Sequence, residues 1–233
     1  MPDLELEKRK VNTRDAINVE VFSLDDIKRH FNDSVSLILK QIQLADNLFA
    51  SGLNEEAKDV LRSQIVFIDS AFDFYMHELL KLGIINMFHG DWAPRTEKYQ
   101  NLKLDMKTLE VAITDDGSDE WLKNWINNKY SGKPLMSFED FVEVCNLLAL
   151  DVKDIADKIF YDKNSRTPTR DKLKYILNGL STRRNQIAHQ SDRKRENAER
   201  EDITEEYVNE TLDNIKNVIE AVHFFASQKD NTH

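Results

Sequence analysis

A regular apolar stripe between residues 55 and 88 constrains the fold of this chain more than any other feature. Its large hydrophobic residues recur at steps of three and four along the sequence: Leu61, Ile65, Ile68, Phe72, Tyr75, Leu79 and Leu82. This spacing places them all on one face of an α-helix. The stripe therefore predicts one long helix over 55–88, with an apolar face that must be buried against other helices.

Three further stripes of the same kind predict three more long helices. They cover residues 24–50, 170–190 and 204–227, and Ser23 is placed to cap the first of them. Inside 170–190, Gly179 is a candidate break, after which Ser181 would cap the remainder. The chain has only six glycines and four prolines and little alternation of β-branched residues, which together predict an all-α fold.

The order of the stripes predicts the architecture. A short connection at residues 51–54 makes the first two helices antiparallel neighbours. We expect an antiparallel four-helix bundle, with 91–162 as a helical insertion between its two hairpins. Residues 1–22, with a strand-like patch at Val19–Phe22, are expected to form an N-terminal arm, and 23–233 a single domain. Within the insertion, Ser137 and Asp151 are expected to cap short helices, and Trp121 and Trp125 to anchor another helix to the core.

Composition bounds the cellular setting. No run of residues approaches the length of a membrane span, and the first residues lack the features of a secretory signal. The single cysteine, Cys145, excludes a disulfide or a multi-cysteine metal site within one chain. The acids at 115–119 lack the spacing of a calcium loop. These features predict a cytoplasmic protein with no membrane partner and no bound metal.

The net charge of −10 at pH 7 argues against a general affinity for nucleic acid, but the average conceals an asymmetry. Residues 163–200 carry eleven Lys and Arg against four Asp and Glu, a local net charge of +7. This basic segment, which includes Arg183, Arg193, Lys194 and Arg195, indicates a local site for a polyanion. The alternative is that 193–200 is an ordinary solvated loop.

A permanent cation, an amide and an imidazole lie close together in the run Arg183-Arg184-Asn185-Gln186-Ile187-Ala188-His189. On a helix, Asn185 and His189 share a face and Arg184 lies beside them, while Leu180, Ile187 and Ala188 can face the core. A guanidinium can bind phosphoryl oxygens, and an imidazole can transfer a proton near neutral pH. These are the groups that chemistry on a phosphodiester requires.

Two acids, Asp69 and Asp73, flank the stripe of the second long helix. Acids beside a core stripe are commonly surface carboxylates. The alternative is that one of them orients the arginine or the histidine of the 183–189 run across the bundle.

Arg184, Asn185 and His189, in the run Arg-Asn-Gln-Ile-Ala-His, resemble the Arg-(four to six)-His motif of HEPN domains. The surroundings agree, because a long helix with Asp73-Phe74-Tyr75 precedes the motif helix and another helix closes the domain. The resemblance covers roughly 24–90 and 169–228. Two departures are that neither a tyrosine nor a glycine follows His189, where Gln190 and Ser191 stand instead.

The resemblance implies a function. HEPN domains are helical bundles that commonly dimerise, so that two motifs meet in one composite cleft. Many are metal-independent RNA endonucleases of toxin, antiphage or CRISPR-associated systems, in which the RNA 2′-hydroxyl attacks the adjacent phosphate and leaves a 2′,3′-cyclic end. The expected partners are RNA, a second copy of the chain, and an antitoxin or other defence protein.

By the same resemblance, His189 would move the proton, Arg184 would stabilise charge on the phosphate and Asn185 would orient the groups, with no cofactor. Asp73 resembles the acidic or polar residue found on the first core helix of such domains. RNA contacts are expected from the basic residues Arg183, Arg193, Lys194 and Arg195. Two alternatives stay open: a non-catalytic HEPN-like module for RNA binding or dimerisation, and a purely structural partner-binding bundle.

Overall fold

The structure is a computed structural model that describes residues 19–114, 117–194 and 196–230. Within these residues it contains nine α-helices and no β-strand, apart from an isolated antiparallel bridge between Arg193 and Arg200. The all-α prediction is therefore confirmed. Most of the expected N-terminal arm, residues 1–18, lies outside the described residues.

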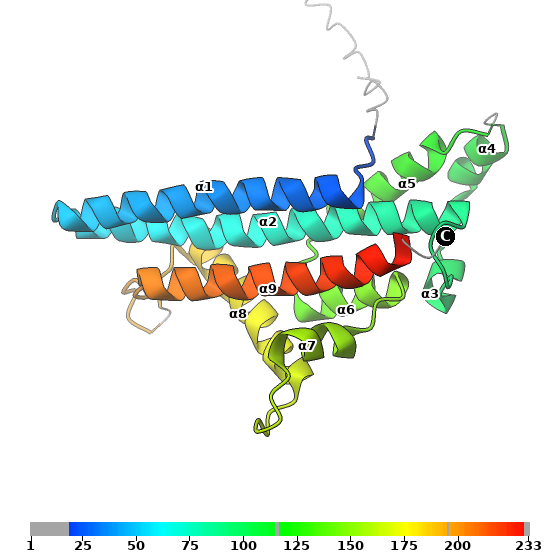
Figure 1. The fold of residues 1–233 in the computed structure, drawn as a ribbon. Helices are drawn as coiled ribbons and strands as arrows, with labels where there is room; N and C mark the ends of the chain where they lie inside the picture. Colours follow the sequence, from blue (N-terminus) through cyan, green and yellow to red (C-terminus); the bar gives the residue numbers. More distant parts are fainter. Residues whose placement is uncertain (1–18, 115–116, 195, 231–233) are drawn as a thin grey trace, which may run out of the picture.

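Four long helices form the frame, within a few residues of the predicted bounds. They are α1 (Leu24–Ala50), α2 (Asn54–His89), α8 (Thr169–Gln190) and α9 (Glu205–Asp230). The predicted cap of α1 is confirmed, because the Ser23 hydroxyl accepts a hydrogen bond from the backbone N–H of Asp26. In Figure 1, α1 and α2 form an antiparallel hairpin, α9 runs beside α2 in the same direction, and α8 crosses obliquely beneath them.

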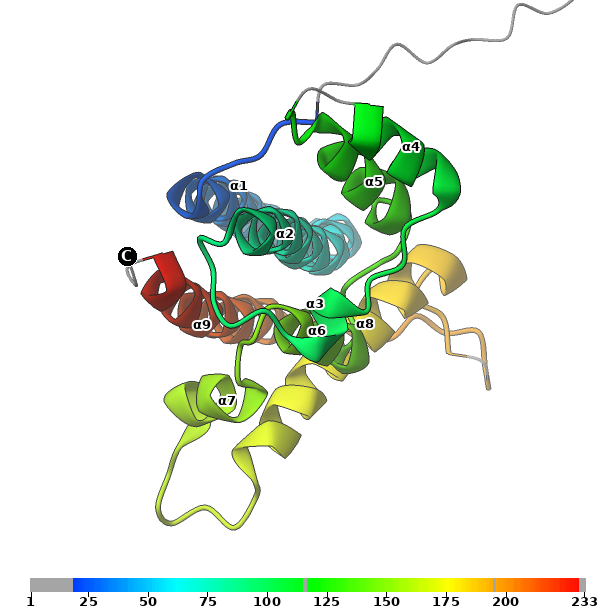
Figure 2. The same cartoon turned by 90° about the vertical axis from the view of Figure 1, so that its right-hand side faces the viewer.

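Helix α2 lies at the centre of the bundle. Viewed along its axis in Figure 2, it is surrounded by α1, α9 and the shorter helices. Its stripe from Leu61 to Leu79 is almost fully buried, and the core also takes residues from α1, α5, α6, α7, α8 and α9. Because α2 is enclosed on several sides, polar residues next to its stripe, such as Asp69, are buried as well.

Five shorter helices stand between α2 and α8 in the chain: α3 (Glu97–Gln100), α4 (Met106–Thr114), α5 (Glu120–Tyr130), α6 (Phe138–Leu147) and α7 (Val152–Phe160). Helices α5 and α6 pack on α2, while α6 and α7 pack on α8. The predicted caps hold, since the side chains of Ser137 and Asp151 accept backbone hydrogen bonds at the starts of α6 and α7. Residues 131–137 link α5 to α6 and run past α2.

Three local predictions were wrong. Helix α8 continues unbroken through Gly179, so Ser181 caps nothing. The Val19–Phe22 patch is irregular rather than a strand; Val19 is buried, and Val21 and Phe22 pack on the core. At Val21 and Phe22, packing on the core outweighs the local preference for a strand. In α8, the cost of one glycine in a helix interior, about 1 kcal/mol, is too small to break the helix at Gly179.

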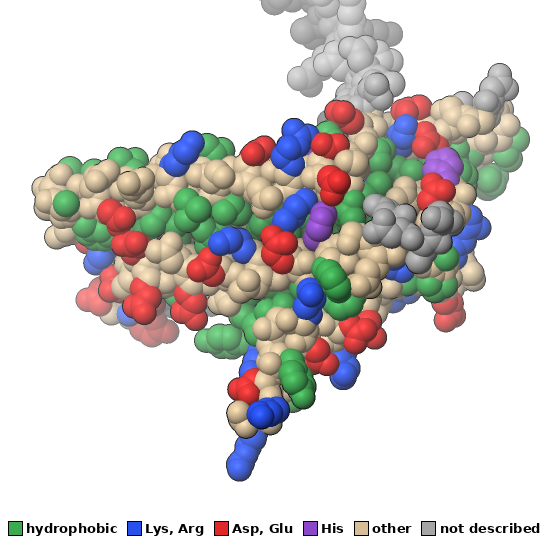
Figure 3. All heavy atoms as spheres, in the orientation of Figure 1, with side chains coloured by type: hydrophobic (Ala, Val, Ile, Leu, Met, Phe, Trp, Pro, Cys, Tyr) green, Lys and Arg blue, Asp and Glu red, His purple; other side chains and the backbone are tan. Residues whose placement is uncertain are grey.

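The surface in Figure 3, formed by α1, α2 and α9, carries interspersed acidic and basic side chains, and Lys and Arg side chains gather at the tip of the loop between α7 and α8. No helix of the described part of the chain has the length and apolar character needed to cross a membrane.

Two helical glycines provide a matched test of packing. A Cβ on Gly83, within α2, would lie 2.9 Å from Cζ3 of Trp92 and still closer to Leu148, whereas a Cβ on Gly179 would meet no atom within 4 Å. Gly179→Ala should therefore raise the unfolding free energy by about 1 kcal/mol, or the melting temperature by about 2–4 °C. Gly83→Ala should lower the unfolding free energy by about 1–3 kcal/mol through overpacking. Thermal unfolding measures both, and a stabilised Gly83→Ala would contradict this packing.

Candidate functional site

Arg184, Asn185 and His189 lie on the last two turns of α8 and line one pocket. The pocket has a volume of about 580 Å³ and three walls, formed by α2, by α8 and by residues 131–137 with the start of α6. The same pocket is also lined by Val66, Asp69, Ser70, Asp73, His77, Lys133, Asp140 and Ser181, among others. The three motif residues that the sequence predicts to act together therefore share one cleft, which we call the motif cleft.

Asp69 of α2 is the residue that holds the motif arginine. Its side chain is 1% exposed, and its Oδ2 lies 3.2 Å from Nε of Arg184. Arg184 also donates from Nη1 to Oδ1 of Asn185 at 3.0 Å, so the guanidinium is fixed from two sides while part of it still faces the cleft. Of the two acids that flank the α2 stripe, the one that pairs with the motif is therefore Asp69.

The pKa of Asp69 is raised from 3.8 to about 7, chiefly by burial; the charge of Arg184 lowers it and the nearby charge of Asp73 raises it, and both effects are smaller. The other carboxylate oxygen, Oδ1, has no hydrogen-bond partner among the described residues. Asp69, a buried carboxyl with one cationic partner, therefore changes between its neutral and ionised forms near neutral pH.

Asp73 lines the cleft as well, and its own contacts are with the 131–137 segment and with His77. Its Oδ1 accepts a hydrogen bond of 2.6 Å from the backbone N–H of Leu135, and its Oδ2 lies 3.6 Å from Nε2 of His77. These contacts tie the 131–137 segment to α2. Asp73 therefore positions a wall of the cleft, and the contact with the motif arginine falls to Asp69, one turn earlier.

His189 is exposed at the edge of the cleft, one residue before the end of α8. Its ring forms no hydrogen bond or ion pair with the described residues. The ring is therefore accessible to a ligand. Ile187 packs on the core as expected, but Ala188 is exposed, contrary to the prediction.

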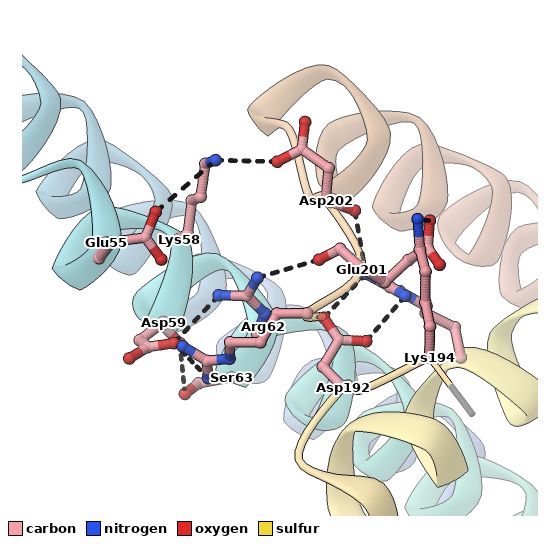
Figure 4. Close-up of polar contacts among 11 residues, drawn as sticks. Glu55, Lys58, Asp59, Arg62, Ser63, Asp192, Lys194, Glu201 and Asp202 are labelled. Carbon is pink, nitrogen blue, oxygen red and sulfur yellow. Dashed lines mark hydrogen bonds and ion pairs between the residues drawn. The ribbon is translucent and has the colours of Figure 1, made fainter. Parts of the chain in front are cut away.

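Arg183 is largely buried, and its guanidinium is engaged inside the protein. It is 9% exposed, and its guanidinium pairs with Asp192, which is completely buried: Nη1 lies 2.7 Å from Oδ1 and Nη2 lies 2.9 Å from Oδ2. Arg62 of α2 reaches the same carboxylate, with Nε 2.7 Å from Oδ2, and also donates to the carbonyl of Glu201 (Figure 4). This buried cluster fixes the turn after α8 to α2.

The basic segment 163–200 is not one surface. Its residues are distributed along the whole of α8 and the loops at both ends, and five of its ten described cations form ion pairs: Lys174, Arg183, Arg184, Lys194 and Arg200. Arg193 is exposed but donates to the carbonyl of Ala198, and Lys194 lies 3.6 Å from Glu201. Arg195 lies outside the described residues. Within the basic segment 163–200, several of the described cations are thus already paired with acids of the protein.

Sequence reasoning missed His77 and Lys133 as residues of the cleft. His77 follows Asp73 by one helical turn, which is a signal that could have been read from the α2 pattern. Lys133 belongs to the insertion and pairs with Asp140 and Glu143, at 3.5 and 2.7 Å. No periodicity connects this loop with α2, so its position could not be predicted. Among the described residues, no group of three or more His, Cys, Asp or Glu side chains is placed to hold a metal ion.

Comparison with known proteins gives one match. A protein-family model described as RiboL-PSP-HEPN matches residues 29–223, which is most of the chain and includes α2, the 131–137 segment and the whole motif helix. No curated protein and no solved structure matches.

The raised pKa of Asp69 predicts how stability changes with pH. The folded state binds this proton more tightly than the unfolded state, so the stabilisation is complete below the unfolded pKa of 3.8 and is lost as the pH rises towards about 7. Each pKa unit corresponds to about 1.4 kcal/mol. The unfolding free energy of the wild type, minus that of Asp69→Asn, should therefore decrease between about pH 4 and pH 7 and be constant above that range. Urea unfolding at several pH values measures it; a difference that does not change with pH would contradict the assignment.

Proposed function

The chain belongs to the RiboL-PSP-HEPN family, and from this premise we propose that it is a cytoplasmic, metal-independent endoribonuclease that acts as a homodimer. Family membership by itself indicates a nuclease-like or RNA-binding module. The observation that carries the proposal further is the motif cleft, where a buried carboxylate holds the guanidinium of Arg184 and the exposed ring of His189 lies at the edge. We treat residues 23–233 as one domain, because α5, α6 and α7 share a core with the long helices.

In the proposed reaction, the ring of His189 takes the proton of a ribose 2′-hydroxyl. The 2′-oxygen then forms a bond to the adjacent phosphorus, the bond from phosphorus to the 5′-oxygen breaks, and the 5′-oxygen takes up a proton from the second His189 of the dimer. The products are a 2′,3′-cyclic phosphate and a 5′-hydroxyl. General acid–base catalysis of this kind contributes a factor of about 10²–10⁴ to the rate.

Arg184 would stabilise the negative charge that develops on the phosphoryl oxygens, because a guanidinium donates two parallel hydrogen bonds to such a group. The pairing with Asp69 fixes the guanidinium before the substrate arrives. Asn185 would hold the outer edge of the guanidinium, since its Oδ1 already accepts a hydrogen bond from Nη1. The other acids of the cleft are engaged: Asp140 by Ser137 and Lys133, and Asp73 by Leu135 and His77.

Cleavage of RNA in the presence of EDTA is the direct test. Purified protein should cut a mixture of tRNA and mRNA without added metal and leave cyclic-phosphate ends, and His189→Ala should reduce the rate about 10²–10⁴-fold. His89→Ala is the matched control, because His89 is a partly exposed histidine that pairs with Asp119 at the far end of α2. We expect this variant to cleave like the wild type.

The competing function is a non-catalytic RNA-binding or dimerisation module. In that case the wild type and His189→Ala would retain RNA equally in a gel-shift experiment, and no cyclic-phosphate ends would form. A role as a toxin or antiphage effector, with an antitoxin or another defence protein as partner, extends the same proposal and rests on the family resemblance.

An apolar groove next to the motif cleft is the surface that we propose for the dimer. The groove lies between α1 and α2, has a volume of about 670 Å³, and contains the exposed side chains of Leu37, Phe67 and Phe74. No charged residue lines it, and Ser70 lines both the groove and the motif cleft. A chain of net charge −10 repels its own copies, so a two-fold contact, which places the same patch on both partners, is favoured where that patch is uncharged.

A charge in this groove should separate the dimer. Phe67→Asp places two carboxylates at the two-fold contact, so we expect a monomer by light scattering and a loss of cleavage. Ile113→Asp is the matched control, because Ile113 on α4 is even more exposed and lies outside the groove. A dimeric, fully active Phe67→Asp protein would exclude this surface as the interface.

A further inference from the structure

A second hollow lies on α8, on the face turned away from the core, and the proposed function does not use it. Its volume is about 660 Å³. It is lined by Asp171, Lys174, Tyr175, Asn178, Gly179, Thr182, Arg183 and Gln186 of α8 and by Tyr207 of α9. We call it the tyrosine hollow. Its lining combines two aromatic rings and three uncharged polar side chains with one acidic and two basic residues.

Tyr175 gives the hollow an exposed aromatic wall. The residue is 82% exposed, and it forms no hydrogen bond with the described residues. Tyr207, from the first turn of α9, is 38% exposed and lines the same hollow. Large aromatic side chains contribute to stability when they are buried, so the exposed ring of Tyr175 adds little to the fold. It lines the same hollow as Tyr207 and is open to a flat ligand.

Gly179 leaves open the space beside Tyr175. It lies one helical turn after the tyrosine, and a Cβ there would meet nothing within 4 Å. Side chains on a helix lean towards its N-terminus, so the missing side chain exposes the helix surface directly next to the Tyr175 ring. Glycine weakens a helix interior, and no packing requirement explains it here, in contrast to Gly83, which Leu148 and Trp92 crowd.

The rest of the lining combines amide and hydroxyl groups with three charged residues, Asp171, Lys174 and Arg183. Asn178, Thr182 and Gln186 lie along the same strip of α8. Their side chains can both donate and accept hydrogen bonds, as the edges of nucleobases require. The first turn of the helix also carries Arg170 and Lys172, which form no ion pair with described residues, although the Arg170 guanidinium lies over the Phe138 ring.

The tyrosine hollow and the motif cleft are connected along one helix. Gln186 lines the hollow and precedes His189 by three residues, while Gly179 precedes it by ten residues, or about 15 Å along the axis. A single strand held at the motif cleft and following α8 towards its start would pass over the hollow within a few nucleotides. Base stacking on exposed aromatic residues is the common way in which proteins bind such strands.

We propose that the tyrosine hollow binds an unpaired nucleobase of the RNA substrate, stacked on Tyr175 over the helix surface at Gly179. The inference rests on the proposed function for its ligand but involves none of the residues assigned to the chemistry. Because stacking grows with the size of the ring system, the site favours purines over pyrimidines.

Binding of short single-stranded RNA to the His189→Ala protein tests this site without cleavage. Oligoadenylate should bind more tightly than oligouridylate, and Tyr175→Ala should weaken oligoadenylate binding roughly tenfold and remove the preference. Tyr175→Phe keeps the ring and should bind like its parent. Tyr161→Ala is the matched control, because Tyr161 is 76% exposed at the end of α7 and lies outside the hollow.

Gly179→Leu provides a second, independent variant. The added side chain enters open space on a helix, so the protein should fold normally, but the slot beside Tyr175 is filled and the preference for oligoadenylate should disappear. The site is excluded if both Tyr175→Ala and Gly179→Leu bind both oligomers within about twofold of the parent, or if the parent binds neither. A protein partner would then be the remaining candidate ligand for the tyrosine hollow.

The outcomes separate this inference from the proposed function. EDTA-resistant, His189-dependent cleavage with no effect of Tyr175→Ala or of Gly179→Leu on binding retains the ribonuclease and excludes the base site. Absence of cleavage, together with a purine preference that depends on Tyr175, excludes the ribonuclease and retains a site for single-stranded RNA.

Discussion

The buried carboxylate of Asp192 determines where the motif helix ends. Ser191 and Asp192 both adopt left-handed backbone angles, with φ of 51° and 59°, which turn the chain sharply after α8. The Asp192 side chain then lies between Arg62 of α2 and Arg183 of α8, out of contact with water. Burying three charges is tolerable only when they pair closely, and removal of one partner from such a cluster typically destabilises a protein by about 3–5 kcal/mol. The position of His189, three residues before Asp192, depends on this cluster.

Two neighbouring arginines on α8 thus have opposite roles. Successive residues on a helix point about 100° apart, so Arg183 turns towards Asp192 inside the bundle while Arg184 turns towards Asp69 in the motif cleft. Asp192 has two guanidinium partners, whereas Asp69 has one, Arg184. Burial of Asp69 is the main reason that its pKa is raised to about 7, and its single cationic partner only partly opposes this. A phosphate that entered the motif cleft would compete with the Asp69 carboxylate for Arg184. Because Asp69 can take up a proton near neutral pH, it can give up this ion pair, and Arg184 could then bind the phosphate.

The four long helices and the grouping of the motif residues could be predicted from the sequence, because both depend on local periodicity. The apolar stripes define the four long helices, and a spacing of four or five residues brings Arg184, Asn185 and His189 to one cleft. The choice between Asp69 and Asp73 could not be made, since it depends on the angle at which α8 crosses α2. The burial of Arg183 was equally hidden, because its partner belongs to a turn with unusual backbone angles. The sequence predicts a break at Gly179 because helix propensity takes no account of how the whole helix packs in the fold.

The insertion between the two hairpins completes the motif cleft, which suggests where substrate choice resides. Residues 131–137 form one wall, and this wall is fixed at three points: Asp73 holds Leu135, Asn178 of α8 accepts from the backbone N–H of Phe138, and Lys133 pairs with Asp140 and Glu143. Because this wall is tied to both α2 and α8, it stays in place beside the motif residues, and their geometry does not depend on a movement of the wall. The chemistry can therefore be common to the family motif, while the shape of the cleft belongs to the inserted segment. In the proposed ribonuclease, changes in 131–137 that leave Asp73, Asn178 and Lys133 in place would alter which RNA enters the cleft without disturbing Arg184 or His189.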